Sequence, residues 1–474
     1  MAARAAVVVA LSILALFAVS GCGERPDPAA PSRGGQGTAA RGPGESEFPK
    51  GLGPLDLPTS APPDVLVLML DTVRADRCSF VGYERPTTPQ LEALARESVV
   101  FTDAWSPSSW TLPAHVALFT GRHQEPLGAV GPTQRPVPKD VPTLASLLAG
   151  RGFATGCFTG NPWIAEHDGL SRGFELVVRV YDDADGPTAR AAHTRALQWM
   201  QARRRDRTPF FAFINDVETH IPRTPPETFE QRFLAQGTDP AIRNSARSLI
   251  HPRSALMGLG LEPTDPALLR AVSDLYDAEL AHLDDEVGRL VRGMRDSGLL
   301  DGTLVVVLSD HGEGLGDHVW LEHGAFVHRE LLRVPLLVRP PHGGPPRTVS
   351  DVVRVEDVFA EVLAQCGVAL PPGATALPLL GDTSGRVALA SERAPEIVGE
   401  RMEEMRGPAS AAILRTWRRS AYDGRFHLIV DDRGGLELFD VRDDPRETRN
   451  VAAAHPDIVA ALRAKIAAVP PRPR

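Results

Sequence analysis

The hydrophobic residues of the chain gather in short continuous runs that are separated by longer segments of mixed character. A run of four to eight apolar residues bounded by polar or turn residues is typical of a strand that is buried on both faces of a sheet. We therefore predict strands at residues 65–70, 99–101, 155–159, 210–214, 303–308 and 331–338.

Between these runs, apolar residues recur at helical spacing. This pattern predicts helices at residues 89–98, 141–149, 189–205 and 268–297. Strands that alternate with helices indicate an α/β fold, with a mostly parallel sheet and helices on both of its faces. Residues 223–265 are rich in proline, and we expect them to form an irregular insertion on the substrate side.

The pattern changes near residue 370. Two short strands are predicted at residues 386–391 and 426–431. The pair Gly434 and Gly435 marks a turn into a further strand at 436–439, and a last helix is predicted at 455–469. We therefore divide the folded chain into residues 64–370 and 371–474.

The N-terminus has the composition of a targeting segment. Arg4 precedes an apolar run at residues 5–19, which is short for a membrane span and typical of a signal peptide. Residues 19–22 resemble a bacterial lipobox, so we predict a lipoprotein signal peptide at 1–21 and lipidation of Cys22. An ordinary signal peptide and an uncleaved anchor are the alternatives.

A lipidated Cys22 would tie the protein to a membrane and place it in the bacterial cell envelope, facing the periplasm or the exterior. The segment 22–63 is rich in Pro, Gly, Ala and Ser and has no hydrophobic period, so we predict a disordered tether.

Charge and cysteine content narrow the choice of function. Charged residues make up 23% of the chain, and its net charge of −9 comes without a basic patch, which argues against a nucleic-acid partner. The chain has four cysteines, and lipidation of Cys22 would leave an odd number. No disulfide framework is therefore predicted.

Three polar residues follow two of the predicted strands at the points where a site would form. Asp71 follows the first strand, and Asp310 and His311 follow the strand at 303–308. The carboxyl ends of parallel strands meet at one edge of a sheet, and carboxylates with an imidazole suit Zn, Mn or Ca. An acid and a histidine that only cap a loop are the alternative.

Thr111 is predicted at the N-terminus of a helix, with Pro113 in the first turn. Free backbone N–H groups and the helix dipole favour an anion there. A plain helix N-cap is the alternative role for Thr111.

Several short motifs occur in the order that one family shows. They are LDTVRADR at residues 70–77, Gly82 with Tyr83, TTP at 87–89, SWTLPAH at 109–115 and LFTG at 118–121. With these motifs the chain resembles the sulfatase family of the alkaline-phosphatase-like superfamily, over about residues 64–469. The resemblance implies the fold of that superfamily, with a small C-terminal antiparallel α+β subdomain.

The resemblance also assigns roles to residues. It implies that Asp71, Asp310 and His311 are metal ligands, whereas the next acid of the family pattern is replaced by Thr72. The sulfatase signature begins with a Cys or Ser that is oxidised to formylglycine. Thr111 stands at that position, and His115 replaces the arginine of the signature. Threonine is not expected to be converted to formylglycine.

Threonine at this place resembles a branch of the superfamily that comprises phosphoesterases, phosphonate hydrolases and envelope phosphotransferases. There a metal-bound threonine attacks phosphorus, so Thr111 is predicted to be both a metal ligand and the nucleophile. His220 matches the histidine of the family's His-X-Pro loop, and His323 falls near a position that is often lysine. We expect both to bind the anion, protonate the leaving oxygen or hold a second metal ion. We expect His115 to bind the anion in place of the arginine.

These inferences predict a metal-dependent hydrolase or transferase that acts on phosphate or sulfate esters, with phosphoesters favoured. It would use one divalent ion, with a second left open. A small-molecule, glycan or lipid ester would be the substrate. A sulfatase without formylglycine and a weakly catalytic binding lipoprotein are the alternatives. Asp317, His318 and His328 are predicted only to shape a loop.

Overall fold

The computed structural model describes residues 62–470, with the exception of 132–134, 168, 185 and 251. The predicted signal peptide and almost all of the predicted tether lie outside the described residues. Among the residues described, no helix combines the length and the apolar character that a membrane crossing requires.

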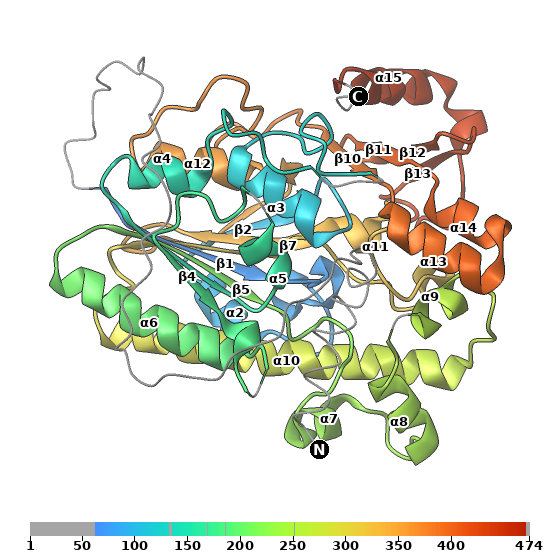
Figure 1. Cartoon of the computed structure of the whole chain (residues 1–474), viewed down its shortest axis with the longest axis horizontal. Coiled ribbons are helices and arrows are strands. Elements are labelled where there is room, and N and C mark those ends of the chain that lie inside the picture. Colours follow the sequence, from blue (N-terminus) through green and yellow to red (C-terminus); the bar gives the residue numbers. More distant parts are fainter. Residues whose placement is uncertain (1–61, 132–134, 168, 185, 251, 471–474) are drawn as a thin grey trace, which may run out of the picture.

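One large sheet forms the centre of the molecule, in the strand order β4-β3-β5-β1-β6-β7-β2-β8, with β9 paired to β2 (Figure 1). Strand β1 (Asp64–Leu70) lies between β5 (Phe210–Asp216) and β6 (Thr303–Leu308) and is parallel to both. Strand β7 (Arg333–Arg339) is antiparallel to β6 and to β2 (Val99–Trp105). The remaining strands are β3 (Ala154–Thr159), β4 (Leu176–Arg179), β8 (Arg347–Val349) and β9 (Val353–Arg354).

Strand β1 shows why the central strands have continuous apolar runs and do not alternate between apolar and polar residues. Val67 packs in the core on one face of the sheet, and its neighbour Leu68 packs in the core on the other face. All seven residues of β1 are buried. Because successive side chains of a strand point to opposite faces, a strand covered on both sides needs apolar residues throughout.

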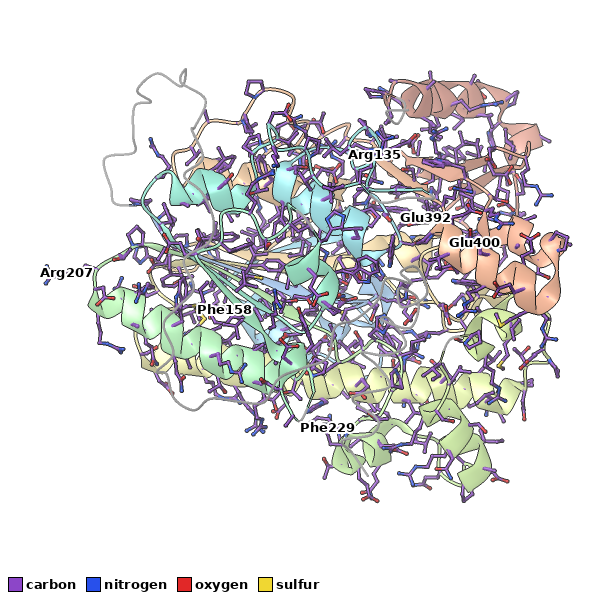
Figure 2. All side chains as sticks on the ribbon, viewed as in Figure 1. Arg135, Phe158, Arg207, Phe229, Glu392 and Glu400 are labelled. Carbon is purple, nitrogen blue, oxygen red and sulfur yellow. The ribbon has the colours of Figure 1, made fainter. Side chains whose placement is uncertain are left out.

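Helices cover both faces, as Figure 1 shows. One face carries α2 (Pro89–Ala95), α6 (Ala189–Arg205) and the long α10 (Pro266–Asp296). The other carries α3 (Thr111–Thr120), α4 (Leu144–Ala149), α5 (Pro162–Glu166) and α12 (Asp357–Gln365). Phe158 of β3 packs against Trp199 of α6, with ring centroids 5.8 Å apart (Figure 2). The predicted α/β class is confirmed.

The segment 223–265 is not irregular, so that expectation was wrong. It contains α7 (Glu227–Phe233), α8 (Pro240–Arg247) and α9 (Arg253–Gly258). Pro240 stands in the first turn of α8, where Asp239 caps the helix by accepting a hydrogen bond from the Ala241 backbone N–H. Proline in a first turn starts a helix and does not break it.

A second sheet of four antiparallel strands forms the C-terminal unit. Its strands are β10 (Ala388–Glu392), β11 (Arg418–Tyr422), β12 (Phe426–Asp431) and β13 (Leu436–Asp440). The helix α15 (Pro456–Ala467) lies within the predicted range 455–469, and it buries Leu462 against this sheet. The strand β11 and the pair α13 (Glu396–Arg406) and α14 (Pro408–Leu414) were not predicted.

Short elements complete the chain. They are the helix α11 (Arg329–Leu332) and the 3₁₀ turns η1 (Ala75–Arg77), η2 (Ser79–Val81), η3 (Val180–Asp182), η4 (Asp317–Val319) and η5 (Ala452–Ala454).

Candidate active site

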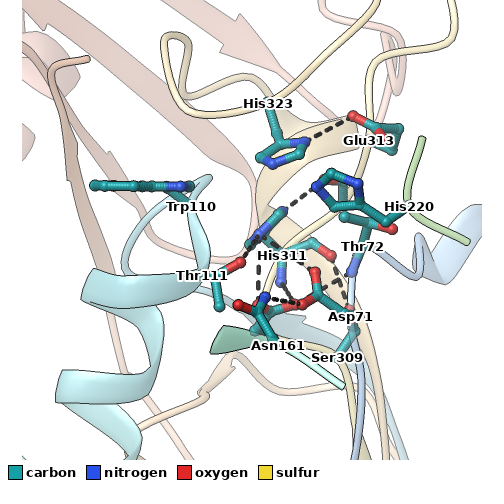
Figure 3. A network of polar contacts seen from close by, with 12 residues as sticks. Asp71, Thr72, Trp110, Thr111, Asn161, His220, Ser309, His311, Glu313 and His323 are labelled. Carbon is teal, nitrogen blue, oxygen red and sulfur yellow. Dashed lines mark hydrogen bonds and ion pairs between the residues drawn. The ribbon is translucent and has the colours of Figure 1, made fainter. Parts of the chain in front are cut away.

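Three predicted metal ligands meet at the carboxyl edge of the large sheet, and Figure 3 labels two of them, Asp71 and His311. Asp71 follows β1, and Asp310 and His311 follow its neighbour β6. All three side chains are fully buried, and one possible ligand atom of each lies within 4.8 Å of the other two. The His311 Nε2 is 3.9 Å from Asp71 Oδ1 and 3.4 Å from Asp310 Oδ2.

The hydrogen bonds of these residues leave one carboxylate oxygen of each acid without a partner. Asp71 Oδ2 accepts from the Asn161 amide at 2.8 Å, and Asp310 Oδ1 accepts from the backbone N–H groups of Thr72 and His311 at 3.2 and 2.9 Å. His311 Nδ1 bonds the Gly312 carbonyl at 2.8 Å, which directs the lone pair of Nε2 into the group. Asp71 Oδ1 and Asp310 Oδ2 are buried and have no hydrogen-bond partner.

Two orphaned carboxylate oxygens beside an imidazole nitrogen fit a divalent cation. Burial raises the pKa of Asp71, and the Asp310 carboxylate raises it further. Burial lowers the pKa of His311 to about 3, and the charge of His323 acts in the same direction. The group therefore combines a neutral imidazole with two acids whose negative charge lacks compensation, which is the environment that a bound cation stabilises.

Thr111 is the first residue of α3, and Trp110 occupies the N-cap position. The Thr111 hydroxyl does not cap the helix; its Oγ1 lies 3.3 Å from His311 Nε2. The residue is 2% exposed. Thr111 is therefore not a plain helix N-cap. Its hydroxyl lies at the three candidate metal ligands, next to the positive end of a ten-residue helix.

His115 lies beneath this group and not beside an open face. Its ring is fully buried, its Nδ1 contacts the Thr111 carbonyl at 2.8 Å, and the same nitrogen is 3.7 Å from Asp310 Oδ2. The rings of Phe119 and Phe213 pack edge-on against it. These contacts do not support the expected role of His115 in binding the anion and are those of a residue that positions Thr111 and Asp310.

His220 and His323 approach the group from two loops (Figure 3). Their ring centroids are 4.9 Å apart, and the ring of His323 is 4.6 Å from that of His311. The His220 Nδ1 bonds the Ile221 carbonyl at 2.8 Å, which leaves its Nε2 for a ligand. The structure therefore brings both predicted histidines to the ligand group.

Two charged residues that the sequence did not single out hold His323. Glu313 is fully buried, accepts from His323 Nδ1 at 2.9 Å and pairs with Arg223 at 3.1 Å. Burial opposes a charge on His323, but the Glu313 carboxylate outweighs it and raises the pKa of His323 to about 9. His323 can thus carry the positive charge that the family often supplies with lysine. Glu313 follows Asp310 by three residues, which is the only signal that could have revealed it.

Thr72 stands where the family pattern has a further acid. Its φ is 62°, an unusual value for a β-branched residue. Its Oγ1 bonds Thr219 Oγ1 at 3.0 Å, and Tyr276 donates to its carbonyl at 2.8 Å. Thr72 therefore braces the loop that carries Asp71, and Asn161 is the further side chain that contacts the Asp71 carboxylate.

A mostly parallel sheet with this buried group at its carboxyl edge defines a sulfatase-like ester hydrolase. The family model described as Sulfatase matches residues 63–368 of the chain. The chain belongs to the sulfatase family, as the resemblance of its motifs implied.

The similar proteins agree with this assignment. An uncharacterized sulfatase of Escherichia coli, YidJ, is 24% identical over 82% of this chain and 83% of its own length. An arylsulfatase of Clostridium perfringens is 21% identical over 82% of this chain and 90% of its own length. Among solved structures, the phosphonate monoester hydrolase of Agrobacterium radiobacter has a similar fold, with a TM-score of 0.70 and 20% identity over 85% of this chain and 95% of that chain.

Proposed function

We propose that the protein is a metal-dependent hydrolase or transferase of anionic esters, that Thr111 is its nucleophile and that it prefers phosphoesters to sulfate esters. The observation that carries this proposal is the contact of 3.3 Å between the Thr111 hydroxyl and His311 Nε2, at the two orphaned carboxylate oxygens. The fold likeness to a phosphonate monoester hydrolase is consistent with the preference.

Asp71, Asp310, His311 and Thr111 would hold one divalent cation. When bound, such an ion lowers the pKa of a hydroxyl and neutralises negative charge on the ester. The described residues of the site offer no lysine, so His220 and His323 are the groups that would bind the ester oxygens. The ion pair with Glu313 orients His323 for this contact.

The chemistry then has two steps. Thr111 releases its proton to solvent, its Oγ1 forms a bond to phosphorus and the bond from phosphorus to the leaving oxygen breaks. His323 donates through Nδ1 to Glu313, which raises the pKa of His323 to about 9, so the proton on its Nε2 is available to the leaving oxygen. In the second step water attacks phosphorus and gives its proton to His323, the bond from phosphorus to Thr111 Oγ1 breaks, and the Thr111 oxygen takes up a proton from solvent. An alcohol in place of water would make the same protein a transferase.

The test compares threonine variants on both ester classes. We expect Thr111→Ala to lose at least 10³-fold in kcat, because the nucleophile is removed, and Thr111→Ser to keep part of the activity. Thr120→Ser is the matched control in the same helix, because its hydroxyl only bonds the Val116 carbonyl. Each variant is assayed with a phosphodiester, a phosphonate monoester and an aryl sulfate. Unchanged turnover by Thr111→Ala would disprove the assignment, and faster turnover of the aryl sulfate would disprove the preference.

We also propose that the protein is a lipoprotein of the cell envelope, anchored through Cys22. The proposal is supported by the signal-peptide pattern and the lipobox-like residues 19–22. Cells that express the chain and are fed a labelled fatty acid should yield a labelled protein, and Cys22→Ala should abolish the label. Equal labelling of the two proteins would contradict the proposal.

A further inference from the structure

A cavity that none of the candidate active-site residues line lies where the large sheet domain meets the C-terminal unit. It has a volume of 350 Å³ and shares no residue with the metal-ligand group. Five arginines and one histidine line it: Arg74, Arg77, Arg329, Arg333, Arg446 and His318. Three acids, Asp76, Asp317 and Glu330, also line it.

The three acids are already paired. Arg74 donates through Nε and Nη2 to the Asp76 carboxylate and through Nη1 to Asp317 at 2.6 Å. Glu330 accepts from His318 Nδ1 at 2.9 Å. The three carboxylates exceed Arg74 and His318 by one negative charge, and Arg77 pairs with Asp277 outside the cavity at 3.4 Å. The excess positive charge of the cavity therefore lies on Arg329, Arg333 and Arg446.

Arg329 and Arg333 are the two partly buried arginines of the cavity that no close carboxylate neutralises. Arg333 donates through Nε and Nη2 to the Thr102 carbonyl, and its closest acid is Asp103 at 3.8 Å. Arg329 donates through Nη1 to the Pro445 carbonyl at 3.3 Å, and its Nε is buried without a hydrogen-bond partner. Among the described residues, none places a carboxylate within 4.0 Å of the Arg329 guanidinium.

The two guanidinium groups also affect each other. Burial lowers the pKa of Arg333, and the positive charge of Arg329 lowers it further. Asp103 offsets part of the charge of Arg333, but two cations held close together with one distant carboxylate are costly in a partly buried site, and the unsatisfied Arg329 N–H adds to that cost. Arginine is also the side chain that best matches the geometry of phosphate and sulfate oxygens.

A metal ion is the competing occupant, because His318, His328 and Glu330 offer three ligand atoms within 4.8 Å. Both ring nitrogens of His318 are already engaged, by the carboxylate of Glu330 and by the Glu447 carbonyl at 3.1 Å. A cation would also have to approach the positive charge of Arg329. These contacts favour an anion over a metal ion.

We propose that this cavity binds a tetrahedral oxyanion, either free phosphate or sulfate or the anionic group of a small ester. Arg329, Arg333 and Arg446 supply the contacts. The volume of 350 Å³ exceeds the space that a lone anion needs and lies within the range of small-ligand pockets. The proposal does not depend on the proposed function, because no group of the catalytic machinery lines the cavity.

The test is a calorimetric titration of the full metal-loaded protein at fixed ionic strength with inorganic phosphate, inorganic sulfate and glucose 6-phosphate. A His220→Ala background weakens binding at the active site, so that the second site is measured alone. We expect Arg329→Gln to raise the dissociation constant at this site at least tenfold, while ester hydrolysis by the protein with His220 intact is retained. Arg446→Gln, whose side chain is exposed, should also weaken binding without a risk to folding.

The control is Arg463→Gln, an exposed arginine of α15 that does not line the cavity and should leave binding unchanged. Binding of the inorganic ions identifies a free-anion site, and binding of glucose 6-phosphate alone identifies a site for a small ester; either result supports the proposal. The proposal is overturned if no anion binds in the His220→Ala background or if Arg329→Gln and Arg446→Gln bind like the control. Zinc binding that His328→Gln abolishes would also overturn it.

Discussion

The Tyr276 hydroxyl supports the loop that carries Asp71, and its removal should have a measurable cost. Tyr276 is fully buried in α10; its hydroxyl donates to the Thr72 carbonyl at 2.8 Å and accepts from the Arg74 backbone N–H at 2.9 Å. Tyr276→Phe keeps the ring and takes the partner from both backbone groups. A buried polar group without a partner costs about 1–3 kcal/mol. We therefore expect a loss of about 2–4 kcal/mol in the free energy of unfolding.

The assay is urea unfolding followed by tryptophan fluorescence, with the m-value compared between variants. Tyr181→Phe is the matched control, because the Tyr181 hydroxyl makes an exposed contact with Glu166 at 3.1 Å, and its removal should cost less than about 0.5 kcal/mol. Because the Thr72 carbonyl follows Asp71 directly, the Tyr276 variant should also lose ester hydrolysis at temperatures where it is folded. A Tyr276→Phe protein as stable as the control would refute this account of the loop.

Three further predictions concern other parts of the molecule. Burial opposes a charge on His318, but Glu330 raises the pKa of His318 to about 9. The stabilisation of the folded state by charged His318 should be complete below about pH 6.5 and should be lost as the pH rises through 9. At about 1.36 kcal/mol per pKa unit, this stabilisation amounts to at most ~3 kcal/mol. Thermal unfolding of the wild type and of His318→Gln across this pH range measures it. The thiols of Cys78, Cys157 and Cys366 are buried, and burial raises the pKa of each, so a thiol reagent should label none of the three until denaturant is added; rapid labelling of the native protein would contradict their burial. Removal of divalent ions with a chelator should abolish ester hydrolysis, and addition of one equivalent of a suitable cation should restore it; full activity in the chelated protein would contradict the metal site.

The central strands could be predicted from the sequence because burial on both faces leaves little choice of residue. The strand β6 (Thr303–Leu308) has the bounds that its apolar run indicates. Strand β11 was missed because its sequence, RRSAY, is polar over most of its length and is held by pairing with β10 and β12. Pairing between strands distant in sequence is not visible in a local pattern.

The same limit applies to the site. Asp71, Asp310 and Thr111 could be placed because each follows or starts a regular element whose end has a defined position. Glu313 and Arg223 lie in loops, and their ion pair depends on how two loops meet, which neither loop encodes alone. The motifs place His115 one turn from Thr111, where the structure has it, but they do not show that its ring is buried and faces Thr111 and Asp310.

The most direct test of the central claim is the site of covalent modification. The metal-loaded enzyme is mixed with a phosphodiester, quenched within milliseconds to seconds in acid and digested, and the peptide that contains residues 109–121 is measured by mass spectrometry. The account predicts an adduct on Thr111 that consists of the phosphorus group and the one alcohol of the diester that has not left, because the first step breaks only one ester bond. The same adduct on another residue, or a sulfuryl group on this peptide from an aryl sulfate with no adduct from the phosphodiester, would contradict it.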